Sequence, residues 1–143
     1  MSTEIKPELS TKSKYWIEKH RYYELKHFCL QYNIWKQIVD TLEIEIKNSS
    51  SSGVSLVPVK KSSNYSNPTE AMALKRVFYA NKINMVEETC KETSLALSPY
   101  ILLAVTNGYS YDVLRARTNI PCCRDVYYEL YRRFFWLLDK EHA

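Results

Sequence analysis

Glycine is almost absent from this sequence, with two glycines among 143 residues. Walker-type and dinucleotide-binding loops need several glycines close together, so both kinds of phosphate-binding loop are excluded. The sequence also lacks a paired-carboxylate arrangement and a nucleophile motif. We therefore expect a protein that is not an enzyme and uses no cofactor. No apolar run reaches the roughly 18 residues of a membrane span, and no apolar signal core opens the chain, so we expect a cytoplasmic protein without a membrane partner.

Cysteine is present, but not in a metal-binding pattern. The four cysteines are Cys29, Cys90, Cys122 and Cys123. The adjacent pair lacks the two-residue spacer usual in zinc sites, and no histidine pair is suitably placed. We therefore predict free thiols in a reducing compartment and no metal site.

Positive charge is slight and spread along the chain. The formal net charge is +4 at pH 7, which is weak evidence for a nucleic-acid partner. Any DNA-binding surface must therefore come from local clustering of basic side chains. Scarce glycine and frequent helix formers favour an all-α protein.

The first part of the chain has the pattern of a helical pair. Apolar residues recur with helical periodicity over residues 13–31 and again over 34–46. We expect these two helices to form an antiparallel hairpin within residues 1–47. A flexible linker is expected over residues 48–66, where serine and other polar residues predominate.

A helical domain is expected over residues 67–143. Pro68 suits the first position of a helix, and this helix should run to about Glu92. It has two apolar faces, which predicts packing on both sides. Pro99 marks the start of the next helix, and Gly108 ends it. The predicted fold is thus all-α: an N-terminal helical hairpin, a linker and a C-terminal helical domain.

The C-terminal part has the helix order of a helix-turn-helix. Ser110 can cap a short helix over residues 111–117, a turn follows through Pro121, and a long helix is expected over residues 124–140. In a helix-turn-helix the first helix crosses the DNA backbone and the second enters the major groove. A buried stripe is predicted on the long helix at Val126, Leu130, Phe134 and Leu137.

The face opposite this stripe supplies most of the candidate DNA contacts. Guanidinium groups bind phosphates and guanine edges, and tyrosine hydroxyls reach phosphates. Arginines of the preceding short helix can hold the DNA backbone. The candidate DNA-binding residues are Arg115, Arg117, Arg124, Tyr127, Tyr128, Tyr131 and Arg132.

This segment resembles region 4 of sigma factors, where a Gly-x-Ser-Tyr-x-x-Ile/Leu pattern precedes an isoleucine and a basic recognition helix. The matching residues are Gly108, Ser110, Tyr111, Leu114 and Ile120. Pro121 departs from the usual serine cap. With the helical pair and the linker, the whole layout resembles the phage late-operon transcriptional regulators of the RinA/ArpU type. That resemblance implies double-stranded promoter DNA as ligand, a role in transcription, and no catalytic residues.

Two other functions fit the same pattern. A phage DNA-packaging protein of the small-terminase type also uses a helix-turn-helix, within an oligomeric ring. A helical inhibitor or adaptor would instead use its tyrosines and tryptophans to bind a protein, without DNA. RNA polymerase and a second copy of the chain are further candidate partners.

Overall fold

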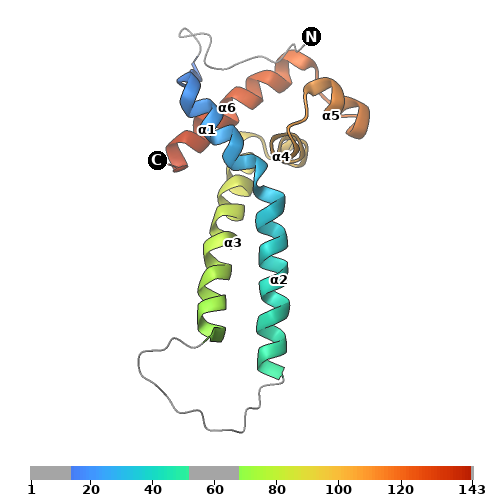
Figure 1. Ribbon diagram of the computed structural model, residues 1–143. Helices are drawn as coiled ribbons and strands as arrows, with labels where there is room; N and C mark the ends of the chain where they lie inside the picture. The colour runs from blue at the N-terminus through green and yellow to red at the C-terminus, as the bar shows by residue number, and fades with distance from the viewer. Residues whose placement is uncertain (1–13, 52–67, 143) are drawn as a thin grey trace. The chain divides into compact units, whose positions relative to one another are not determined.

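A computed structural model describes residues 14–51 and 68–142 (Figure 1). All regular structure in these two ranges is α-helical, which confirms the all-α prediction. Within the same ranges, no helix combines the length and the apolar character needed to cross a bilayer. The helices are α1 (Lys19–Leu30), α2 (Tyr32–Ser51), α3 (Pro68–Thr93), α4 (Ser98–Asn107), α5 (Tyr111–Thr118) and α6 (Arg124–His142).

The chain forms two compact units, and their boundaries differ from the predicted ones. One unit comprises Met1–Tyr32 with Asn84–Ala143, and the other comprises Asn33–Ile83. The two N-terminal helices follow each other directly, joined at Gln31. Each packs against later helices, however. Within its own unit α1 contacts α4 and α6. Its contact with α6 is made by aromatic rings that pack against each other.

Helix α1 begins later than expected, at Lys19. Residue 13, where the predicted helix begins, lies outside the described residues. Glu18 is the N-cap: its carboxylate accepts hydrogen bonds from the backbone N–H groups of His20, at 2.9 Å, and Arg21, at 3.4 Å. The hydrogen bond from His20 lowers the pKa of Glu18, since a carboxylate near a helix N-terminus is favoured in its charged form.

Aromatic rings join α1 to α6 in the core of the first unit. The hydroxyls of Tyr22 and Tyr131 lie 2.6 Å apart in a buried hydrogen bond. The ring of Tyr22 also packs edge-on against Phe135, with centroids 5.3 Å apart. At the other end of α1, Phe28 contacts the ring of His142. Such edge-to-face pairs stabilise beyond the area that they bury.

The prediction chose the wrong face of α6 as the buried one. Val126 is 48% exposed, and Leu130 and Leu137 are half-buried; of the predicted stripe only Phe134 is fully buried. The buried residues are instead Tyr127, Tyr128, Tyr131, Phe134, Phe135 and Leu138. The reason is the area of the tyrosine rings: each buries more apolar surface than a valine, provided that its hydroxyl is accommodated.

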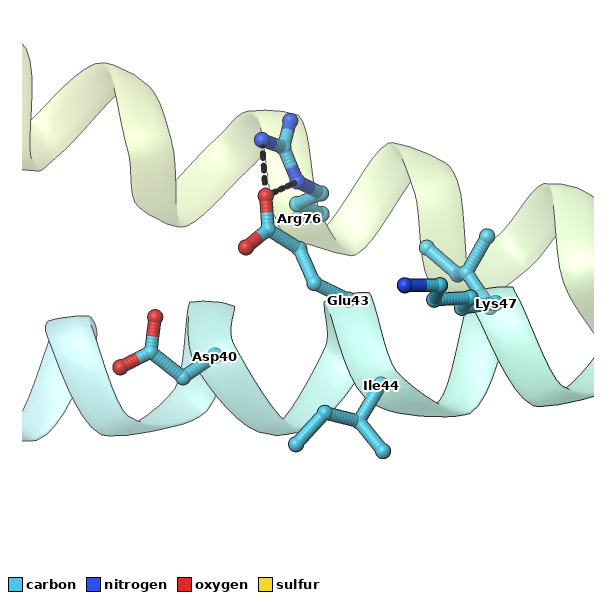
Figure 2. Close-up of a pocket in the computed structure, with 6 residues that line it drawn as sticks. Asp40, Glu43, Ile44, Lys47 and Arg76 are labelled. Carbon is cyan, nitrogen blue, oxygen red and sulfur yellow. Dashed lines mark hydrogen bonds and ion pairs between the residues drawn. The ribbon is translucent and has the colours of Figure 1, made fainter.

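The second unit is a pair of antiparallel helical segments, α2 and the first part of α3. Two pairs fix their direction: Glu43 with Arg76 at 2.9 Å (Figure 2), and Ser49 with Thr69 at 3.3 Å. Buried and half-buried residues recur in alternating steps of four and three, the heptad spacing of a coiled coil. These seam residues are Trp35, Val39, Leu42, Ile46 and Ser49 on α2, and Thr69, Met72, Arg76, Tyr79 and Ile83 on α3.

Two expectations about α2 and α3 are only partly met. Helix α3 starts at Pro68 and ends at Thr93, close to the predicted bounds. Its second apolar face is not packed along the whole helix, because Leu74, Val77 and Phe78 are largely exposed. The predicted linker begins too early, since α2 continues through Ser51. The rest of that linker lies outside the described residues.

Leu138 tests the corrected core of the first unit. Its side chain is fully buried, whereas Leu95 is 77% exposed. We expect Leu138→Ala to lower the free energy of unfolding by about 2–5 kcal/mol, because a cavity replaces buried methyl groups. The matched change Leu95→Ala should alter it by less than about 0.5 kcal/mol. Chemical denaturation of both variants measures this, and equal losses would contradict the assignment of the core.

The cysteines provide a second test of burial. Cys29 and Cys90 are buried, whereas Cys123 is exposed. Burial raises the pKa of the Cys90 thiol to about 12, so almost none of the reactive thiolate exists at about pH 8. We expect iodoacetamide to modify Cys123 first, and Cys90 only after the protein is unfolded. Mass spectrometry of partly labelled protein measures the order, and fast labelling of Cys90 in folded protein would contradict it.

Candidate nucleic-acid interface

Helix α5 is short because a cap residue bounds it at each end. Ser110 accepts a hydrogen bond from the backbone N–H of Val113 at 3.3 Å, which starts the helix. Asn119 ends it in the left-handed conformation, with φ 60, a conformation that asparagine tolerates better than most residues. The preceding α4 ends in the same way at Gly108, with φ 71. These caps confirm the predicted limits of both helices.

The turn between α5 and α6 is fixed from both sides. The hydroxyl of Tyr111, at the start of α5, donates to the carbonyl of Cys122 at 2.5 Å. The backbone N–H of Tyr111 donates to the hydroxyl of Tyr128 at 3.2 Å. Ile120 is buried within the turn. The structure therefore has the helix-turn-helix layout that the sequence predicts, with a turn of defined conformation.

Two of the predicted arginines meet at this turn. Arg115 from the end of α5 and Arg124 from the start of α6 line one open hollow of about 360 Å³. Asn119, Cys122 and Cys123 line the same hollow. Asp112 lines it too, so the hollow combines two guanidinium groups with one carboxylate. Guanidinium groups are the side chains that most often bind phosphates.

Arg124 is held by contacts within this site. Its guanidinium donates to the carboxylate of Asp112 at 2.6 Å and lies 5.5 Å from the ring centre of Tyr111. The hydrogen bond to Asp112 raises the pKa of Arg124. Both partners are well exposed, and exposed ion pairs contribute little net energy. The ion pair with Asp112 therefore holds Arg124 only weakly.

The other two predicted arginines do not line this hollow. Arg117 is exposed, and its guanidinium stacks at 5.0 Å from the ring centre of Tyr109. Arg132 is half-buried and lies two turns further along α6 than Arg124, about 12 Å along the helix axis. Arg115 and Arg124 are thus brought together, while Arg117 and Arg132 stand apart.

The three predicted tyrosines belong to the core and not to the interface. Tyr127, Tyr128 and Tyr131 are 1%, 2% and 7% exposed. Tyr128 and Tyr131 use their hydroxyls inside the protein. The placement of these three rings on a DNA-facing surface is therefore wrong, for the same reason that the predicted stripe of α6 is wrong.

The outward face of α6 near its start is acidic and partly apolar. Asp125, Val126 and Glu129 are exposed there. Carboxylates repel phosphates but accept hydrogen bonds from the amino group of cytosine. Asp112 and Asn119 also belong to the site without having been predicted for it. Each could have been found from a local sequence pattern. Asp112 is an acid in the first turn of a helix, and Asn119 is an asparagine in a turn.

No protein-family model, curated protein or solved structure matches this chain.

Tyr127 and Tyr128 offer a test of which buried hydroxyl stabilises the core. The hydroxyl of Tyr127 is buried and finds no hydrogen-bond partner among the described residues, and burial raises its pKa well above the usual value. Tyr127→Phe should therefore leave the free energy of unfolding unchanged or raise it by up to about 1 kcal/mol. Tyr128→Phe, which loses the bond to Tyr111, should lower it by about 1 kcal/mol or more. Thermal denaturation compares the two, and a marked loss of stability in Tyr127→Phe would contradict this assignment.

Proposed function

We propose that the protein is a sequence-specific DNA-binding regulator of transcription, with phage or prophage promoters as its targets. The single observation that supports this most is the hollow at the α5–α6 turn, where Arg115 and Arg124 lie beside Asn119. The resemblance of this segment to sigma region 4 and of the whole layout to RinA/ArpU-type regulators supports the promoter as ligand. RNA polymerase is a candidate partner on the same ground.

In this proposal the two helices have different roles. Arg115, in the last turn of α5, binds a backbone phosphate and fixes the register on the duplex. Arg124, in the first turn of α6, exchanges Asp112 for a phosphate or a guanine edge, which it can bind bidentately. Arg117 adds a further phosphate contact. Because the inner face of α6 is filled by tyrosines, base contacts come from its first turn and its outward face.

Titration with specific and scrambled duplexes at two salt concentrations tests the proposal. Arg115→Ala should weaken binding to both duplexes alike and reduce the salt slope by about one. Arg124→Ala should cost about 1–3 kcal/mol on the specific duplex if it reads a guanine. Asp112→Asn should strengthen binding, because it removes a negative charge and releases Arg124.

The control is Lys91→Ala, which removes an exposed positive charge on α3 and should leave binding unchanged. Unchanged affinity in folded Arg115→Ala and Arg124→Ala would remove the α5–α6 turn as the DNA-binding element. No binding of the unaltered protein at low salt would instead favour the helical protein-binding adaptor. A defined ring by light scattering would favour the small-terminase type.

A further inference from the structure

Helix α3 carries a second heptad seam on the side turned away from its seam with α2. The residues of this outer seam are Ala71, Leu74, Phe78 and Asn81, again in steps of three and four. Leu74 and Phe78 are 67% and 54% exposed, and the flanking Val77 is 49% exposed. At 100° per residue the two seams lie on nearly opposite faces of the helix. Large apolar side chains grouped on one exposed face mark an interaction surface.

We propose that this outer seam pairs with the same seam of a second copy of the chain, with the two α3 helices parallel. In a parallel coiled coil, Leu74 meets its own copy at the centre, and Phe78 forms the next layer. The charges beside the seam select this direction. Glu70 occupies a position g and Lys75 the following position e, so each Glu70 faces Lys75 of the other copy, twice across the two-fold axis.

The antiparallel alternative is disfavoured by the same charges. It would bring the e positions of the two copies together, so that Lys75 faced Lys82. Like charges placed opposite each other oppose association. In the parallel pair, Lys82 instead flanks Val77 of the other copy. The amine of Lys82 lies at the border of the two seams, 4.8 Å from the ring centre of Phe78 and 5.7 Å from that of Trp35, and such long side chains cover apolar surface.

Asn81 and the length of the seam set the character of the dimer. A polar asparagine in an otherwise apolar seam can pair with its own copy and fix register and number of chains, at a cost in stability. The seam offers four layers, so we expect the dimer to bury less area than a standard stable interface. The dimer is therefore reversible and depends on protein concentration. This proposal stands independently of DNA binding.

Sedimentation equilibrium of the full chain over the micromolar range tests the pairing. The unaltered protein should shift from monomer to dimer as concentration rises. Leu74→Glu and Phe78→Glu should each raise the dimer dissociation constant by about tenfold or more, since each places a charge in the apolar seam. Leu95→Glu is the matched control: it places the same charge at a leucine of similar exposure, 77% against 67% for Leu74, and should leave the dissociation constant unchanged. Circular dichroism verifies that all variants are helical.

Charge exchange tests the parallel direction. Glu70→Lys and Lys75→Glu should each weaken the dimer by about threefold, and the double exchange should restore it. In an antiparallel pair, Lys75→Glu alone would strengthen the dimer, because the new carboxylate would face Lys82.

Three results would overturn the proposal. They are a monomer at all concentrations, a dimer insensitive to Leu74→Glu, and a dimer strengthened by Lys75→Glu.

Discussion

The packing of tyrosine and phenylalanine rings between α1 and α6 is the interaction on which the first unit depends. Tyr22 on α1 meets Tyr131 and Phe135 on α6, and its hydroxyl bonds to that of Tyr131. This contact joins the first helix of the chain to the last. It also fixes how α6 is rotated about its own axis. That rotation decides which side chains of α6 reach solvent, and therefore what α6 can offer to a ligand.

The same rotation limits the candidate interface to the turn before α6. With its tyrosines directed inward, the start of α6 presents one arginine, Arg124, and two exposed acids, Asp125 and Glu129. A long basic reading surface is therefore absent from the described part of α6. Positive charge gathers where α5 ends and α6 begins. A site of this kind needs few phosphate contacts, which agrees with the modest net charge of the whole chain.

Helix limits could be predicted from the sequence because local chemistry sets them. Pro68, Ser110 and Gly108 each act within one turn of their own position. The buried face of α6 could not be predicted from the sequence, because helical periodicity gives two overlapping stripes, one aliphatic and one aromatic. Only the partner helix decides between them, and α1 supplies aromatic rings from far away in the sequence. Arg115 and Arg124 were predicted as contacts, but their meeting in one hollow depends on the conformation of the turn, above all at Asn119.

Helix α3 illustrates how one pattern can serve two partners. Its inner seam is satisfied by α2 within the chain, and pairs such as Glu43 with Arg76 mark the antiparallel direction (Figure 2). Its outer seam repeats the heptad spacing with the exposed side chains of Leu74 and Phe78, and its flanking charges suit a parallel neighbour. A helix that had only to cover α2 would gain nothing from Leu74 and Phe78 in water. Two seams on nearly opposite faces of one helix thus allow intrachain and interchain pairing at the same time, because neither partner covers the other's seam.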